Sequence, residues 1–163
     1  MNHTEVRDRV AGRVILLDPE GRVLLFHGKD PQHPEAPWWY TPGGGVEPGE
    51  TPQQAAAREL SEETGLSVEP TALGEHVFHN YVEFPFDGAL LRQHNYLFLV
   101  RAASARISID ELGDTEQRTY LGHRWWAAED LRQTGETYFP QELAEIVMRL
   151  RGGPGDGEGA VTP

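Results

Sequence analysis

Residues 44–66 read GGVEPGETPQQAAARELSEETGL, which predicts a turn followed by a helix that carries three acidic side chains. Thr51 is a suitable N-cap, Pro52 suits the first helical position, and Gln54 completes a capping-box pattern. Good helix formers follow until Gly65, which favours the left-handed conformation of a C-terminal cap. We therefore expect one helix over residues 52–64.

Three glutamates on this helix carry the first indication of chemistry. Glu59, Glu62 and Glu63 are spaced i, i+3 and i+4, so a helix places them on one face within reach of one another. Acidic residues spaced in this way on a helix usually form a solvent-exposed face. Clustered carboxylates also suit Mg²⁺ or Mn²⁺, which bind them together with substrate phosphates. The glutamates alone leave both interpretations open.

The residues around the glutamates decide between these interpretations. The whole stretch resembles the Nudix box, G-x5-E-x7-R-E-U-x-E-E-x-G-U, where U is a bulky aliphatic residue. The constrained positions are filled, in order, by Gly44, Glu50, Arg58, Glu59, Leu60, Glu62, Glu63, Gly65 and Leu66. Such a match at every fixed position is much more specific than a glutamate triplet.

This resemblance implies an α/β fold, an α/β/α sandwich with a mixed β-sheet between helices. It also implies a hydrolase that uses Mg²⁺ (or Mn²⁺) to split the diphosphate linkage of a small nucleoside diphosphate derivative. Water attacks phosphorus in this reaction, and the cations position that water and lower its pKa. The identity of the group attached to the diphosphate is left open.

The resemblance also assigns roles to residues. It implies metal binding by Glu59, Glu62, Glu63 and the Gly43 carbonyl. It implies a supporting role for Gly44, Glu50, Arg58 and Gly65, in which Glu50 and Arg58 form an ion pair.

A carboxylate must accept the proton of the attacking water. Glu59 is the first choice for this role. Glu116, from a later loop, is the second, and Glu111 and Asp114 compete with it as polar loop residues.

Residues outside the box give weaker indications of substrate contacts. Trp39, with its neighbours Trp38 and Tyr40, is suited either to stacking on a base or to the core. Arg13 and Arg92 lie on expected strands, where each is placed either against phosphate or on the surface. His76 and His79 are discounted as metal ligands, because residues three apart on a strand point to opposite faces.

The flanking segments predict further strands and helices. We expect strands over residues 13–17, 22–26, 38–41, 75–86, 89–101 and 124–126, and a loop over residues 29–37. A helical turn is expected over residues 128–132, and a last helix from about Pro140 with an apolar stripe of Leu143, Ile146, Val147 and Leu150. Residues 1–151 are expected to form a single domain, followed by a disordered Gly- and Pro-rich tail over residues 152–163.

Composition limits the possible partners. The net charge of −12, from 14 basic and 26 acidic residues, argues against a nucleic-acid polymer as ligand. No apolar run approaches the roughly 20 residues that cross a bilayer. The chain contains no cysteine, which excludes disulfides and thiolate metal sites. We expect a cytoplasmic protein without membrane partners, and a homodimer is possible within the family.

Other functions fit the same sequence less well. Isoprenoid diphosphate isomerases resemble Nudix folds but depend on a reactive cysteine, which this chain lacks. A nucleotide-sensing module without turnover usually has a decayed box, whereas this box is intact. An enzyme of broad and weak activity is compatible with every residue discussed above.

Overall fold

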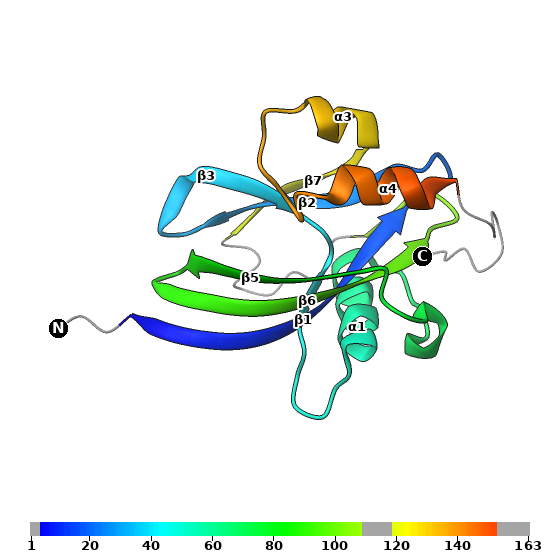
Figure 1. Cartoon of the computed structure of the whole chain (residues 1–163). Coiled ribbons are helices and arrows are strands. Elements are labelled where there is room, and N and C mark those ends of the chain that lie inside the picture. Colours follow the sequence, from blue (N-terminus) through cyan, green and yellow to red (C-terminus); the bar gives the residue numbers. More distant parts are fainter. Residues whose placement is uncertain (1–3, 109–118, 153–163) are drawn as a thin grey trace.

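The computed structural model describes residues 4–108 and 119–152. Its strands form one mixed sheet in the order β5-β6-β1-β2-β3-β8, with β4 paired to β1 and β7 paired to β2. The strands are β1 (Glu5–Leu17), β2 (Val23–Asp30), β3 (His33–Tyr40), β4 (Gly43–Gly45), β5 (Phe78–Phe86), β6 (Ala89–Arg101), β7 (Tyr120–Trp126) and β8 (Tyr138–Phe139). The helices are α1 (Pro52–Thr64), the short 3-10 helix η1 (Pro70–Leu73), α3 (Ala128–Gln133) and α4 (Leu143–Arg151). The expected mixed sheet with helices on it is confirmed (Figure 1).

Strand β1 organises the sheet. It pairs in parallel with β6 from Glu5↔Ala89 to Leu17↔Arg101. At its C-terminal end it turns into β2 through an antiparallel pairing of Leu17 with Val23. Near its middle it also pairs with β4, from Ala11↔Gly45 to Arg13↔Gly43. The box glycines are thereby fixed to the central strand.

Two apolar layers explain the uninterrupted hydrophobic run of β1. Val14 and Leu16 pack into the cluster beneath α1, which includes Leu60. Ile15 and Leu17 face the opposite cluster, beneath α3 and α4. A strand buried on both faces loses the polar alternation of a surface strand, as this one does. The helices therefore cover opposite faces of the sheet and make three layers (Figure 1).

Several predicted boundaries were wrong. Residues 29–37 are not a loop, because they contain the end of β2 and most of β3. Pro34 and Pro37 are tolerated in β3, since only its last two residues pair with β8 and the earlier part is an edge. β1 begins at Glu5 rather than at residue 13, and β7 begins at Tyr120 rather than at residue 124.

The helices follow the sequence more closely. α1 has the predicted bounds, and its capping box is present. α4 begins at Leu143 rather than near Pro140, and Leu143, Ile146 and Val147 of its stripe are buried. The tail predicted to be disordered lies outside the described residues from residue 153 onward.

Candidate functional site

Helix α1, which carries the box glutamates, is fixed in position by its caps and by packing. The Thr51 hydroxyl accepts a hydrogen bond from the Gln54 N–H at 3.1 Å, and Gln54 Oε1 accepts one from the Thr51 N–H at 2.8 Å. Gly65 ends the helix in the left-handed region at φ 77°. Ala55, Ala56, Ala57 and Leu60 are buried against the sheet. With both ends capped and one side packed, the helix is held in a fixed position against β1 and β4.

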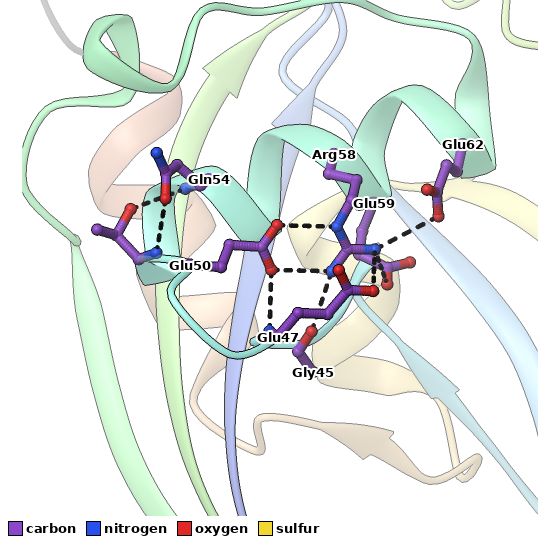
Figure 2. A network of polar contacts seen from close by, with 8 residues as sticks. Gly45, Glu47, Glu50, Gln54, Arg58, Glu59 and Glu62 are labelled. Atoms are coloured by element: carbon purple, nitrogen blue, oxygen red, sulfur yellow. Dashed lines mark hydrogen bonds and ion pairs between the residues drawn. The ribbon is translucent and has the colours of Figure 1, made fainter.

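Arg58 is the centre of an ionic network that joins α1 to the preceding loop (Figure 2). Its Nε donates to Glu50 Oε2 at 2.9 Å, and its Nη2 donates to Glu50 Oε1 at 3.0 Å and to the Gly45 carbonyl at 3.1 Å. The expected ion pair between Glu50 and Arg58 is thus present as a two-bond fork. The hydrogen bond from Arg58 lowers the pKa of Glu50, and the same contact raises the pKa of Arg58.

The second role of Arg58 is to neutralise the box glutamates. Its Nη1 donates to Glu59 Oε1 at 2.9 Å and lies 3.5 Å from Glu62 Oε2. Glu47 adds a longer contact of 3.9 Å. One guanidinium therefore offsets part of the repulsion that adjacent carboxylates on one helix face would otherwise cause.

The glutamates differ in how tightly they are held. Glu63 is buried, and its Oε1 accepts a hydrogen bond from the Gly43 N–H at 2.8 Å. Glu59 lies over β4, where a Cβ on Gly44 would come within 2.6 Å of its carboxylate. Glycine at position 44 therefore leaves room for the Glu59 carboxylate in its present position over the strand. The Glu62 side chain is 54% exposed and faces solvent more openly.

The donor chemistry of this helix face fits a hard divalent cation. Three carboxylates lie on α1, and two of them, those of Glu59 and Glu63, lie against the glycine strand β4. Oxygen donors of this kind suit Mg²⁺ or Mn²⁺. In the described arrangement Glu59 and Glu62 contact Arg58, and Glu63 contacts Gly43. Among residues 4–108 and 119–152, no three His, Cys, Asp or Glu side chains are gathered closely enough to enclose a metal. The carboxylates of Glu59 and Glu62 would therefore have to turn from Arg58 toward a bound cation.

A cavity of about 580 Å³ lies on the other face of β1, between the β5–β6 hairpin and strands β2 and β3. Its apolar wall includes Trp38, Phe84, Phe86 and Phe139, and the rings of Trp38 and Phe86 meet edge-on at 6.2 Å. The size and aromatic lining are typical of a site for a small planar group.

A hydrogen-bonded polar set crosses one wall of this cavity. We call it the amide set; it comprises Arg13, Thr41, Asn80, Gln93 and Asn95. Arg13 donates through Nη1 to the Thr41 carbonyl at 3.0 Å and through Nε to Asn95 Oδ1 at 3.2 Å. Asn95 Nδ2 donates to Asn80 Oδ1 at 2.9 Å, and Gln93 Nε2 donates to Asn95 Oδ1 at 2.6 Å.

Two arginines connect the cavity with the carboxylate helix. Arg9 and Arg13 both line the cavity. Burial lowers the pKa of Arg13, and the negative charges of Glu63 and Glu59 oppose that effect. Burial and the charge of Arg13 lower the pKa of Arg9, while Glu59 raises it. Both guanidiniums remain cationic, because arginine is not deprotonated in proteins. The arginines thus stand between an aromatic cavity and an acidic helix face.

The structure distributes the predicted substrate contacts unevenly. Arg13 lies in the cavity wall. Trp39 is instead a core residue, stacked at 4.1 Å on His27 with its Nε1 donating to Glu136. Arg92 points to the face opposite the cavity, because alternate β6 residues line it, and Arg92 forms a fork with Asp8. Glu116, with Glu111 and Asp114, lies outside the described residues.

Most residues of the amide set were not predicted from the sequence as site residues. Gln93 and Asn95 stand two apart on a strand whose other side chains on that face, Leu91 and Leu97, are buried and apolar. Polar residues in such positions are the signal that was available. His76 and His79 do not lie on one strand as expected, because β5 begins only at Phe78, and their rings lie 6.2 Å apart.

Among the described residues, no helix is both long and apolar enough to span a bilayer.

The chain is similar in sequence to known pyrophosphohydrolases. The RNA pyrophosphohydrolase of Erythrobacter litoralis is 43% identical over 68 residues, which are 42% of this chain and 40% of that protein. The chain thus spans about two fifths of that relative's length. The RNA pyrophosphohydrolase of Roseobacter denitrificans is 33% identical over 129 residues, covering 72% of this chain and 76% of that protein.

The fold agrees with solved structures as well. A NUDIX-family hydrolase from Clostridium perfringens is 17% identical, superposes with a TM-score of 0.62, and covers 87% of this chain and 97% of its own. A family model described as the NUDIX domain matches residues 7–150. The chain therefore belongs to the NUDIX family.

Proposed function

We propose that this protein is a hydrolase dependent on a divalent cation that cleaves the diphosphate linkage of a nucleoside diphosphate derivative. One observation carries the proposal: Arg9 and Arg13 line the aromatic cavity and interact electrostatically with the carboxylates of α1. A nucleotide needs these three environments in this order. A base suits the aromatic cavity, a diphosphate suits the arginines, and cations on that diphosphate suit the glutamates.

Glu59, Glu62 and Glu63 would hold Mg²⁺ or Mn²⁺, with the Gly43 carbonyl as a further ligand. When bound, the cation would polarise the phosphoryl oxygens and lower the pKa of the attacking water. Arg13 is held in place by Thr41 and Asn95, so it can present a fixed positive charge to a phosphate oxygen. Arg58 and Glu50 keep the helix at its distance from β4 and take no part in the bond exchange.

The bond exchange itself is a substitution at phosphorus. The oxygen of water forms the new bond to phosphorus, the bridging P–O bond breaks, and the leaving phosphate takes the electron pair. A carboxylate accepts the proton of the water, and Glu59 is our first choice because it lies over β4 next to the cation ligands. Glu116 is the alternative from the later loop.

The names of the relatives raise RNA as a second class of substrate. The sequence identity to the Roseobacter RNA pyrophosphohydrolase favours it. The net charge of −12 opposes it, because polymer binding depends on neutralising many phosphates. A short nucleotide that enters the cavity needs only the local arginines, and we therefore favour the small substrate.

The test is a substrate panel with product identification. The protein is incubated with ADP-ribose, nucleotide sugars, dinucleoside polyphosphates, NADH, nucleoside triphosphates and a 5′-triphosphorylated RNA, each with Mg²⁺ or with EDTA. Mass spectrometry in ¹⁸O-labelled water identifies the products and the phosphorus attacked. Cation-dependent cleavage of a small nucleotide far above the RNA supports the proposal. Binding of one compound without any turnover would support a nucleotide-sensing module instead.

A further inference from the structure

Two buried polar atoms in the cavity wall have no hydrogen-bond partner in the protein. They are Gln93 Oε1 and Thr41 Oγ1, on residues that are 2% and 1% exposed. Among the described residues the one other such side-chain atom is Trp126 Nε1, which belongs to the core beneath α3 and α4. A buried oxygen without a partner is costly, so its retention calls for a partner from outside the chain.

The orientation of the Gln93 amide follows from Arg13. A guanidinium only donates, so Asn95 must present Oδ1 to Arg13 Nε, as it does at 3.2 Å. Asn95 Nδ2 is then directed to Asn80, and Gln93 must present its Nε2 to Asn95 Oδ1. A flipped Gln93 would place two oxygens against each other. The charge of Arg13 therefore fixes Gln93 Oε1 as the buried oxygen that lacks a hydrogen-bond partner.

The surroundings indicate which ligand group would fill this position. Trp38 and Phe86 offer aromatic faces and edges for a planar ring in the same cavity. Thr41 and Gln93 are both tied to Arg13, Thr41 through its carbonyl and Gln93 through Asn95. An exocyclic amino group carries two N–H donors, one for each oxygen that lacks a partner, whereas a ring N–H carries one.

We propose that Gln93 and Thr41 determine base specificity by accepting hydrogen bonds from the exocyclic amino group of a nucleobase held in the aromatic cavity. This inference rests on the proposed function for the identity of the ligand as a nucleotide. It goes beyond that function because it names two selecting residues and the chemical group that they select.

The test measures binding without turnover. The intact protein in EDTA is titrated by calorimetry with three pairs of nucleoside 5′-monophosphates, whose second members lack the amino group. The pairs are adenosine and purine riboside, guanosine and inosine, and cytidine and pyrimidin-2-one riboside. We expect the amino-bearing member of at least one pair to bind about 10- to 100-fold more tightly, as a buried acceptor left without its partner would require.

Two substitutions and one control assign the preference to these residues. Thr41→Val removes one acceptor with little change of shape, and Gln93→Met removes the other together with the Nε2 donor to Asn95. Both are expected to reduce the preference to less than about 3-fold by weakening the binding of the amino-bearing member. Gln133→Met, the same change at an exposed residue of α3, should retain the full preference. Circular dichroism and thermal unfolding check each variant.

Thermal unfolding also separates a binding role from a structural one. Because the Thr41 hydroxyl has no partner, Thr41→Val should unfold at the same or a higher temperature than the wild type. If Gln93→Met does not fold, Thr41→Val still tests the proposal alone. A preference that survives in the folded variants, a wild type without any preference, or no binding of any amino-bearing nucleotide would each overturn it.

These outcomes are independent of catalysis. A protein that shows the preference but hydrolyses nothing in the substrate panel would refute the proposed hydrolase and retain this inference. A protein that hydrolyses nucleotides without the preference would support the proposed hydrolase and refute this inference.

Discussion

Arg58 holds Glu50 by two parallel hydrogen bonds, from Nε to Oε2 at 2.9 Å and from Nη2 to Oε1 at 3.0 Å. The same guanidinium contacts Glu59 and Glu62 on its other side. The residue that fastens the loop to the helix is therefore also the counter-charge of the helix face, so stability and site geometry are linked through one side chain (Figure 2).

The Glu50–Arg58 fork predicts a dependence of stability on pH. The pKa of Glu50 is lowered in the folded protein, so its stabilising contribution is full above its ordinary value near 4.5 and is lost as the pH falls through the folded-state pKa. Glu50→Gln should therefore be less stable than the wild type at pH 7, by about 1–2 kcal/mol. Urea denaturation should show this difference shrinking toward acid pH. A difference that stays constant down to pH 3 would contradict the prediction.

Gly44→Ala tests the close approach of α1 to β4. The new Cβ would lie 2.6 Å from the Glu59 carboxylate, which must move. We expect stability to change by less than about 1 kcal/mol, because the end of a side chain yields easily. Turnover of the best substrate should fall about 10- to 100-fold, since a small displacement of a positioned group is enough. Gly135→Ala, where a Cβ meets open space, is the matched control and should keep full activity.

Glu62→Gln tests the cation site. The side chain is 54% exposed, so the substitution should leave the unfolding temperature nearly unchanged. Turnover with Mg²⁺ should drop by about 1,000-fold, and EDTA should abolish the wild-type activity reversibly. Glu69→Gln, an exposed glutamate that caps no helix through its side chain, controls for loss of charge. Wild-type turnover in Glu62→Gln would show that Glu62 does not bind the catalytic cation.

Substitutions of the adjacent residues Trp38 and Trp39 should affect substrate binding and folding stability differently. Trp39 is packed between His27 and Trp126, so Trp39→Ala should lower the free energy of unfolding by about 3–5 kcal/mol. Trp38 lines the cavity, so Trp38→Ala should instead raise KM about tenfold or more with a smaller loss of stability. Chemical denaturation and steady-state kinetics on both variants measure these effects. Equal loss of stability in the two would argue against Trp38 as a ligand contact.

The sequence was most informative where local chemistry decides the structure. The bounds of α1 follow from Thr51, Gln54 and Gly65, which act within a few residues of one another. The ion pair of Glu50 with Arg58 was expected from the resemblance and is present. These features need no knowledge of distant segments.

Features that depend on distant pairing were not predictable. The N-terminal part of β1 is polar and becomes a strand because β6 lies beside it. The amide set joins Arg13 to Asn95 across 82 positions of the chain, and no spacing rule indicates such a contact. Trp38 and Trp39 could not be told apart as ligand contact and core residue without knowing which face of β3 is buried.

Strand β1 has a consequence for how this protein can change over evolution. Its odd-numbered residues Arg9 and Arg13 serve the cavity, while its even-numbered residue Gly12 lies beneath α1 with no room for a Cβ. A shift of β1 by one residue against its neighbouring strands would exchange the two sets at once and destroy both functions. Strand β6 has a similar double role, because Gln93 and Asn95 line the cavity while Phe98 packs in the cluster beneath α1. Point substitutions that keep this alternation can therefore change the cavity wall without shifting the residues that support the carboxylate helix.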